Sequence, residues 1–332
     1  MHLVEAEDVR LFPVGLGTWQ FGSNEWAYGS VYAHETAPAI VNRSLDLGVN
    51  LIDTAEIYGF GRSERIVGRA IAGRRDEVFL ATKILPVLPA GPVVGWRARG
   101  SLGRLGTDHV DLYQLHWPNP VVPARATAAE LRRLLDSGVV RHVGVSNYPL
   151  AAWEELEREL GAPVLANQVR YSLVDRRPEA ELLPWAQAHG RVIIAYSPLA
   201  QGLLSGHYGP GRRPHGLRAR TTPFLPRNIS ALAPVLDTLQ QVAAAHDASP
   251  AQIALAWCLR RPNVVVIPGA SSVEQAESNA ASADIELSDE EDEALTRASD
   301  EYQPVSGPAA VVRARADVVT ARLRSIASGL RA

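Results

Sequence analysis

The stretch Leu51-Ile-Asp-Thr-Ala-Glu-Ile-Tyr-Gly59 runs from an apolar pair into a loop that is marked by Gly59 and Gly61. An apolar run that stops at glycine-containing sequence is typical of a short buried strand followed by a turn. The pattern therefore predicts that Asp53 stands at the carboxyl end of a strand and that Tyr58 lies on the loop after it.

Later apolar runs also end in polar side chains. The run that starts at Val78 ends in a lysine, and the run that starts at Val110 ends in a histidine. Because parallel strands end on one side of their sheet, these side chains are expected to meet there. The later members of the series are Lys83, His116, Asn147, Gln168 and Tyr196.

Expected strands and helices alternate along most of the chain. After a first core strand near Gly17, the expected strands are the one that ends at Asp53 and those at 78–82, 110–115, 140–145, 164–168, 191–196 and 264–267. The expected helices cover 35–48, 63–71, 93–105, 127–137, 149–160 and 178–189, with further helices from Ser249 and Ser272.

This alternation predicts an α/β fold, a parallel (β/α)8 barrel of the TIM type. We expect one domain over 1–332, with the barrel at about 11–285. A doubly wound sheet is disfavoured, because Gly15-Leu-Gly17 lacks the third glycine of a dinucleotide-binding turn.

Three segments add to the barrel. The sequence around Val9 predicts an N-terminal hairpin, and residues 197–229, after the seventh strand, form a long Gly-, Pro- and Arg-rich connection of the kind that is usually functional or disordered. Ser288-Asp-Glu-Glu291 is a capping box that predicts a helix over 288–299, and a helical extension would continue to about 330. The tail would pack on the barrel or on another subunit.

The composition excludes several classes of function. A formal charge of −3 and a pI near 6.3 argue against nucleic acid or a membrane surface as the main partner. Cys258 is the only cysteine, which excludes an intrachain disulfide and suits a reducing cytoplasm. The sequence shows no signal peptide and no apolar run that approaches a membrane span. No metal site is expected, because no second histidine or carboxylate sits at ligand spacing.

Asp53, Tyr58, Lys83 and His116 together suit proton transfer to an oxygen that gains charge. A tyrosine hydroxyl has an ordinary pKa of about 10, which a nearby ammonium would lower. We expect Lys83 to do this, Asp53 to balance the buried ammonium, and His116 to orient a substrate oxygen and share in proton transfer. Each residue also has a structural interpretation, as an ion pair, a core histidine or a loop aromatic. Their joint position at strand ends favours a site.

Short motifs lie at the expected strand ends. They are Gly17-Thr-Trp, Asp53-Thr-Ala-Glu-Ile-Tyr58-Gly, Ala81-Thr-Lys83, Asp111-Leu-Tyr-Gln-Leu-His116-Trp-Pro, Gly144-Val-Ser-Asn147, Asn167-Gln168, Tyr196-Ser-Pro-Leu-Ala-Gln-Gly and Ile267-Pro-Gly. In this order and spacing they resemble the aldo-keto reductase superfamily, from near residue 11 to about 300. The last two motifs resemble bacterial branches related to potassium-channel β subunits and pyridoxal reductases.

The resemblance implies an enzyme that binds a nicotinamide cofactor without a Rossmann fold and moves hydride to an aldehyde or ketone. Tyr58 would be the general acid, tuned by Lys83 and Asp53, and His116 would orient the carbonyl. The residues implied on the substrate side are Trp19, Trp26, Tyr28 and Trp117.

The resemblance also implies a set of cofactor contacts. Ser146, Asn147 and Gln168 would hold the carboxamide, Tyr196 would stack on the nicotinamide, and the loop at 197–206 would cover the pyrophosphate. The full set is Gly17, Thr18, Asp53, Ser146, Asn147, Gln168, Tyr196, Ser197, Pro198, Leu199, Gln201, Gly202, Gly269, Ser271, Gln275 and Asn279.

One departure from the family pattern concerns the choice of nucleotide. Members that bind the NADPH 2′-phosphate strongly carry Lys or Arg after the Ile-Pro and again a few residues later, whereas those positions in this chain are Gly269, Ala270, Ser271 and Gln275. Arg212, Arg213, Arg218 or Arg220 of the long loop would be alternative sources of charge. NADP(H) is favoured and NAD(H) remains possible.

Two other functions stay open. A Schiff-base aldolase or lyase would use Lys83 as its nucleophile. A regulatory subunit that senses nicotinamide nucleotide would bind the cofactor and turn over little. The small-molecule carbonyl substrate and the oligomeric state are not specified by the sequence.

Overall fold

The computed structural model describes residues 3–22, 32–87, 91–209, 212, 214, 221–308 and 312. The chain forms two compact units, Met1–Pro198 with Cys258–Glu286, and Leu199–Trp257 with Leu287–Ala332. A single domain over the whole chain therefore remains a prediction.

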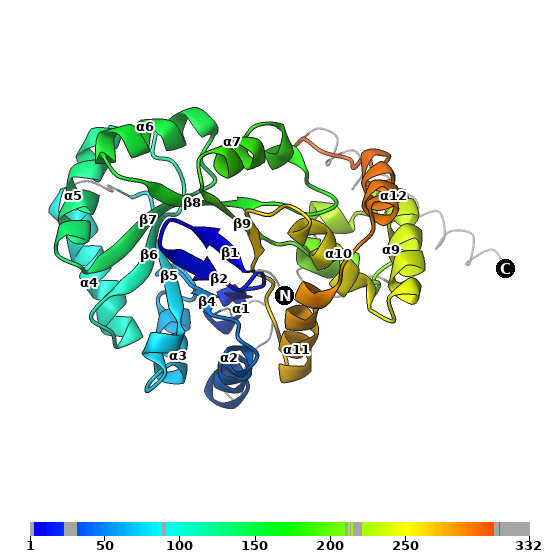
Figure 1. Cartoon of the computed structure of the whole chain (residues 1–332), viewed down its shortest axis with the longest axis horizontal. Coiled ribbons are helices and arrows are strands. Elements are labelled where there is room, and N and C mark those ends of the chain that lie inside the picture. The colour runs from blue at the N-terminus through cyan, green and yellow to red at the C-terminus, as the bar shows by residue number, and fades with distance from the viewer. Residues whose placement is uncertain are drawn as a thin grey trace, which may run out of the picture. The chain divides into compact units, whose positions relative to one another are not determined.

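A parallel barrel forms the first unit (Figure 1). Its eight strands lie in chain order in one sheet: β3 (Leu16–Gly17), β4 (Leu51–Asp53), β5 (Phe79–Ile84), β6 (Val110–Leu115), β7 (Val140–Ser146), β8 (Val164–Arg170), β9 (Val192–Tyr196) and β10 (Val264–Val266). A parallel bridge between Val14 and Val266 joins the two edges, with Gly15 N 2.8 Å from Val266 O. The bridge closes the sheet, and the predicted (β/α)8 fold is confirmed.

Helices cover the outer face of this sheet, as Figure 1 shows for α2 to α6. Strands that are buried on both faces tend to be almost continuously apolar, as in the all-valine β10, whereas β6 is buried throughout although it contains Asp111 and Gln114. The helices of this unit are α1 (Trp19–Gly22), α2 (Ala37–Asp46), α3 (Arg62–Ala70), α4 (Pro92–Leu105), α5 (Ala124–Asp136), α6 (Leu150–Leu160), α7 (Leu182–Ala188) and α11 (Val273–Ala281).

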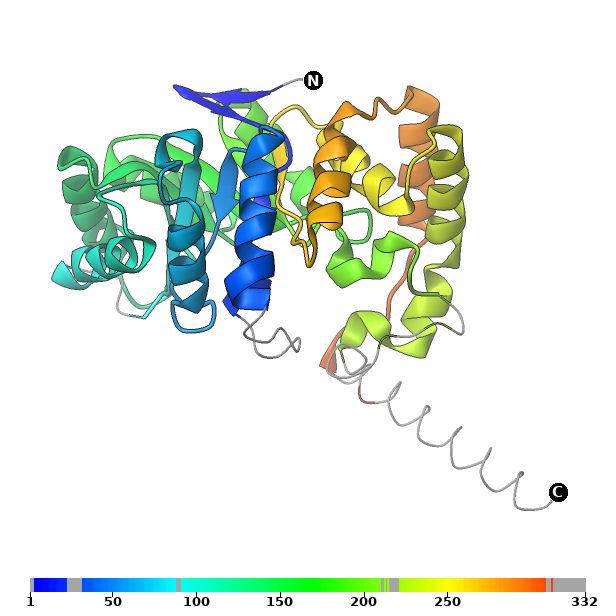
Figure 2. The same cartoon turned by 90° about the horizontal axis from the view of Figure 1, so that it is seen from below.

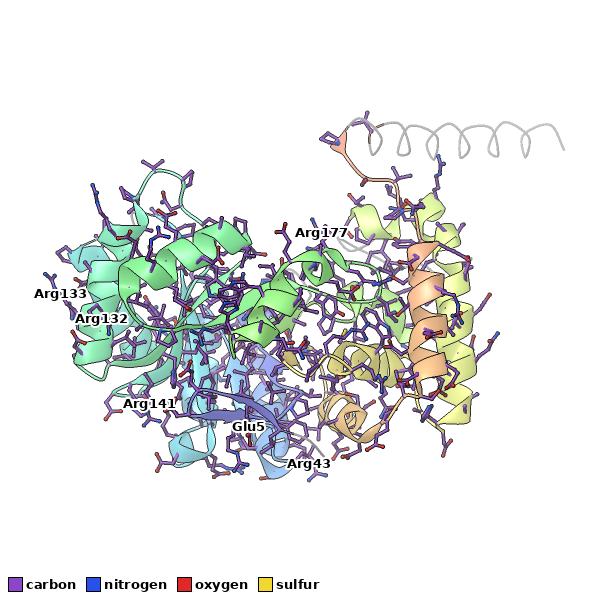
Figure 3. The ribbon with its side chains drawn as sticks, turned by 45° about the horizontal axis from the view of Figure 1, so that its top comes forward. Glu5, Arg43, Arg132, Arg133, Arg141 and Arg177 are labelled. Atoms are coloured by element: carbon purple, nitrogen blue, oxygen red, sulfur yellow. The ribbon has the colours of Figure 1, made fainter. Side chains whose placement is uncertain are left out.

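An antiparallel hairpin of β1 (Val4–Ala6) and β2 (Val9–Leu11) lies across one end of the barrel (Figure 2). Its apolar side chains share a core cluster with side chains from the strands, among them Leu51 and Val192. Both residues stand at the start of their strands, so the hairpin plugs the amino end. In Figure 3, Glu5 of the hairpin and Arg141 of β7 lie toward this end, and Arg177, which follows β8, lies toward the other.

The second unit contains the long connection and the helices around it. Its elements are η4 (Ala200–Ser205), η6 (Thr222–Phe224), α8 (Pro226–Ala231), α9 (Ala233–Ala245), most of α10 (Pro250–Leu259) and α12 (Asp289–Asp300). The capping box before α12 is present, because Ser288 Oγ accepts from Glu291 N at 3.2 Å and Ser288 N donates to the Glu291 carboxylate at 2.8 Å. Residues 302–306, after α12, form no helix, and beyond Pro308 the predicted tail helix lies outside the described residues apart from Val312.

No helix in the described ranges has both the length and the apolar character that a membrane crossing requires.

Candidate active site

Lys83 lies at the centre of the polar cluster at the carboxyl ends of the strands. Its fully buried ammonium is 2.5 Å from Asp53 Oδ1, 2.9 Å from Thr54 O and 3.1 Å from Tyr58 Oη. β4 and β5 are hydrogen-bonded neighbours, so the ends of these strands bring Asp53 and Lys83 together. An ammonium has three donors, and these three oxygens use all of them.

Asp53 is bound from three directions. Its Oδ2 accepts from Gln168 Nε2 at 2.8 Å and from Gln114 Nε2 at 3.1 Å, while Oδ1 holds Lys83. Asp53 is 1% exposed, so these donors replace the water that a carboxylate would otherwise bind. Gln114 is not among the predicted site residues. Gln114 lies on β6 two residues before His116, which directly follows the strand, and this spacing places both side chains on one face and is the signal that identifies Gln114.

Burial and charge act on the pKa values of this cluster in opposite directions. Burial lowers the pKa of the Lys83 ammonium, but Asp53 and Tyr58 outweigh it and the net pKa is raised. Burial raises the pKa of Tyr58, and the Lys83 ammonium offsets only part of the rise. The expected lowering by Lys83 is therefore present, but it does not bring the Tyr58 pKa below its ordinary value. Tyr58 is a protonated hydroxyl at neutral pH, the form that donates a proton.

His116 is a neutral ring in this environment. Burial and the Lys83 ammonium lower the His116 pKa to about 3. The ring stacks on Trp117 with centroids 3.9 Å apart and meets the Tyr58 ring edge-on at 5.9 Å. Its Nδ1 is buried and has no hydrogen-bond partner in the described part of the chain. A neutral imidazole can orient a carbonyl oxygen, but the low pKa gives little support to a share in proton transfer.

These pKa directions predict a flat pH profile between about pH 5 and 9 for any reaction that needs a protonated Tyr58 and a neutral His116. As the pH falls, His116 gains its proton only near its pKa of about 3. As the pH rises, Tyr58 loses its proton only above its ordinary value of about 10. The measurement is kcat/KM, which reports the free enzyme, across buffers of constant ionic strength. An inflection at about pH 6.5, the ordinary value of histidine, would show that His116 titrates as an exposed group.

A second polar group joins this cluster at the ends of β7 and β9. Tyr196 Oη donates to Asn147 Oδ1 at 3.0 Å, and Asn147 Nδ2 donates to Ser146 Oγ at 3.0 Å. Ser146 Oγ donates to the backbone oxygen of Gln168 at 2.9 Å, and the Gln168 side chain reaches Asp53. The residues expected to hold a carboxamide and those expected to transfer a proton therefore belong to one hydrogen-bond network.

Gly17 and Thr18 have structural tasks in this network. A Cβ on Gly17 would lie 2.7 Å from Ile267 O, so the barrel closure leaves no room for a side chain. The N–H and the hydroxyl of Thr18 both donate to Asp53 O, at 3.0 and 2.9 Å, and the side chain is fully buried. These donors hold the strand end that carries Asp53, so they are occupied inside the protein.

The four cofactor residues predicted in and just before α11 contact one another in two pairs. Gln275 Oε1 accepts from both N and Oγ of Ser271 at 2.9 Å. Asn279 Nδ2 donates to Gly269 O at 3.4 Å. Ser272 caps the helix by accepting from Gln275 N, and the first turn of α11 carries no Lys or Arg side chain.

Both charged side chains of α11 are acidic. Glu274 lies in its first turn, and Arg43, which Figure 3 labels on α2, binds Glu277 at 2.6 Å. Arg212 belongs to the other unit, and the remaining candidate arginines, Arg213, Arg218 and Arg220, lie outside the described residues.

The connection after β9 has an unusual backbone. Ser197 has a φ of 52°, and Ala200 and Gln201 have φ values of 48° and 62°. A non-glycine residue with a left-handed backbone conformation costs conformational free energy, and such residues cluster at functional sites. Of the predicted contacts, Ser197 and Pro198 belong to the barrel unit, and Leu199, Gln201 and Gly202 belong to the second unit.

The residues expected on the substrate side are placed only in part. Trp19 and Trp117 are 45% and 42% exposed, so both present aromatic surface outside the core. A Cβ on Gly59 would collide with Gly22 O, which shows that the turn of α1 packs closely on the Tyr58 loop. Trp26 and Tyr28 lie outside the described residues.

Comparisons with known proteins agree with this fold. The sequence profile of the aldo/keto reductase family matches residues 13–300. An uncharacterized oxidoreductase of Mycobacterium bovis is 52% identical over 88% of this chain and 91% of its own length. A methylglyoxal reductase of Escherichia coli is 36% identical over 86% and 89%. The crystal structure of an aldo/keto reductase from Klebsiella pneumoniae with NADP and acetate has a TM-score of 0.72 and 33% identity, and covers 90% of this chain and 94% of that one.

Proposed function

The chain belongs to the aldo/keto reductase family of oxidoreductases, and we propose that it reduces a small aldehyde or ketone with Tyr58 as the general acid. The observation that carries this proposal is the contact of 3.1 Å between Lys83 Nζ and a Tyr58 hydroxyl that is held in its protonated form.

A bound nicotinamide nucleotide supplies the hydride that reaches the carbonyl carbon. Tyr58 donates its proton to the carbonyl oxygen, and the ammonium of Lys83 stabilises the phenolate that this leaves. Asp53 keeps Lys83 charged, since a buried ammonium without a counter-ion would give up its proton. His116, as a neutral ring beside Tyr58, holds the carbonyl oxygen toward the tyrosine hydroxyl.

The side chains at the ends of β7 to β9 fit a nicotinamide. Gln168 turns its Nε2 toward Asp53, because the carboxylate accepts and cannot donate, so its Oε1 is the acceptor for a carboxamide N–H. Tyr196 is fixed by Asn147 and offers a ring for stacking. We propose NADP(H) as the favoured nucleotide, as in the complex of the Klebsiella relative, with NAD(H) as the alternative.

The Schiff-base alternative has less support. A lysine nucleophile must be neutral, yet the pKa of the Lys83 ammonium is raised and its three donors are occupied. Measurement of turnover distinguishes the reductase from the sensor alternative, since a sensor would bind nucleotide and reduce carbonyl compounds very slowly.

We expect the purified protein to bind NADPH and NADH with affinities that differ by no more than about tenfold, because the start of α11 carries no matched cation for a 2′-phosphate. The measurement is fluorescence titration with each nucleotide, followed by loss of nucleotide absorbance with a carbonyl panel headed by methylglyoxal. Binding with turnover supports the reductase. Binding without turnover on the panel favours the sensor, and failure to bind either nucleotide contradicts both.

The variant Gln275→Lys tests where the 2′-phosphate of NADPH binds. A lysine at this position places a cation in the first turn of α11, so NADPH should bind about tenfold more tightly while NADH changes little. Equal effects on both nucleotides would show that the 2′-phosphate lies elsewhere.

A further inference from the structure

Glu56 and Arg97 form a buried ion pair beside the Tyr58 loop that the proposed chemistry does not use. Arg97 on α4 donates from Nε to Glu56 Oε2 at 3.1 Å and from Nη2 to Glu56 Oε1. Both side chains are only 12% exposed. Taking two charges out of water is costly, so this pair differs from the solvated ion pairs of the surface.

The pair ties three segments together. Glu56 Oε1 also accepts the backbone N–H of Leu85 at 2.6 Å. Arg97 Nη1 donates to the backbone oxygens of Leu85 and Val87, each at 3.0 Å. The loop after β4, the segment after β5 and the first turns of α4 therefore meet at one guanidinium. A planar fork with five donors can hold a carboxylate and two carbonyls at once, and an ammonium cannot reproduce this geometry.

These segments carry the two groups whose separation matters for the chemistry. Glu56 lies two residues before Tyr58, and Leu85 lies two residues after Lys83. The N–H of Glu56 also donates to Lys83 O at 3.3 Å. A shift of Glu56 relative to Leu85 would therefore change the contact of 3.1 Å between Tyr58 Oη and Lys83 Nζ.

Apolar packing contributes little on the outer side of these segments. Ile57, Phe60 and Val87 are 37%, 91% and 63% exposed. Segments with few buried apolar contacts open easily unless other interactions hold them. The polar contacts of Glu56 and Arg97 therefore keep these segments in place.

We propose that Arg97 is a positioning residue of the reductase, which acts through Glu56 to hold Tyr58 against Lys83. The inference rests on the proposed function, in which Tyr58 delivers the proton. Arg97 touches neither the substrate nor the nucleotide in this role. It fixes the geometry in which the proton is transferred, where a misplacement of about 1 Å can cost about 100-fold in rate.

The test compares Arg97→Met, Arg97→Lys and Glu56→Gln with the parent protein. We expect Arg97→Met to lower kcat about 10- to 100-fold and to leave the Kd of the nucleotide unchanged within about twofold. Arg97→Lys should recover little of the loss, because it restores the charge and not the fork. If Arg97→Met does not fold, Arg97→Lys and Glu56→Gln carry the same comparison.

Arg191→Met is the matched control. Arg191 is 10% exposed, binds Glu157 and Glu7, and stands just before β9 at the hairpin end of the barrel. Its loss removes a buried guanidinium of similar burial, so it reports the general cost of such a change. We expect kcat within about twofold of the parent. A loss of kcat equal to that of Arg97→Met would overturn the proposal.

The decisive measurement repeats Arg97→Met in a Tyr58→Phe background. If Arg97 acts through the tyrosine hydroxyl, its substitution should lower the residual rate by less than about twofold there, because the two residues work as a unit. The same 10- to 100-fold loss in both backgrounds would overturn the positioning role. If Tyr58→Phe alone leaves turnover intact, the proposed function fails instead, and the two failures are distinguishable.

Discussion

Tyr58→Phe is expected to lower kcat for carbonyl reduction by about 10²- to 10⁴-fold, the usual contribution of a positioned general acid. The substitution removes one oxygen and keeps the ring. The Tyr58 hydroxyl contacts Lys83 Nζ at 3.1 Å, and its removal leaves the oxygens of Asp53 and Thr54 on Lys83, so the ion pair of Lys83 with Asp53 should survive. The Kd of the nucleotide should stay within about threefold, because the residues proposed to hold the nicotinamide are unchanged.

Tyr113→Phe is the control for this substitution. Tyr113 is fully buried on β6, and its hydroxyl has no hydrogen-bond partner in the described ranges of the chain. Removal of an unpaired buried hydroxyl should be neutral or stabilising, and kcat should be unchanged. If Tyr58→Phe lowers kcat and nucleotide affinity equally, the tyrosine contributes to binding, and the acid must be sought elsewhere.

The barrel is predictable because its strands are marked by apolar runs and its helices by their ends. The expected strand at 110–115 is β6, and the expected helix at 149–160 differs from α6 only at its first residue. Gly48 ends α2 as expected, with a φ of 85° at the position where the chain leaves the helix. Helix α9 is not among the expected elements, since it lies beyond the long connection where no strand alternates with it.

The site is predictable to the extent that it lies at strand ends. Polar residues at the ends of neighbouring parallel strands must meet, and this places Asp53, Lys83 and Gln168 together. The contact of Gln114 with Asp53 depends on the register that pairs it with Lys83, and register is a property of the assembled sheet.

The contacts by which Arg97 joins the loop after β4 to the segment after β5 are not predictable from sequence. Glu56 lies inside a recognised motif, but its partner is on a helix that starts after the next strand. Arginines are frequent along this chain, and only the packed helix shows which one turns inward. The sign of the Tyr58 pKa shift is unpredictable for a similar reason, since burial and the Lys83 charge oppose each other and only the structure shows which is larger.

Lys83→Met is expected to have the largest combined effect on stability and activity. It leaves Asp53 as a buried carboxylate without its counter-ion, and removal of one partner from a buried ion pair typically costs about 3–5 kcal/mol of the free energy of unfolding. Two amide donors, from Gln114 and Gln168, remain on Asp53 and should keep the cost toward the lower end. Turnover should fall by about 10²- to 10⁴-fold, because the phenolate loses the ammonium that stabilises it.

The double variant Asp53→Asn with Lys83→Met separates the two effects. Without an unpaired charge at either position, urea unfolding should show that most of the lost stability returns, while kcat stays as low as in Lys83→Met. Recovery of stability without recovery of rate would mean that the ammonium itself serves the chemistry. If the double variant regained both, the ion pair would act only by keeping the fold around Tyr58 in place, and Lys83 would have no direct part in proton transfer.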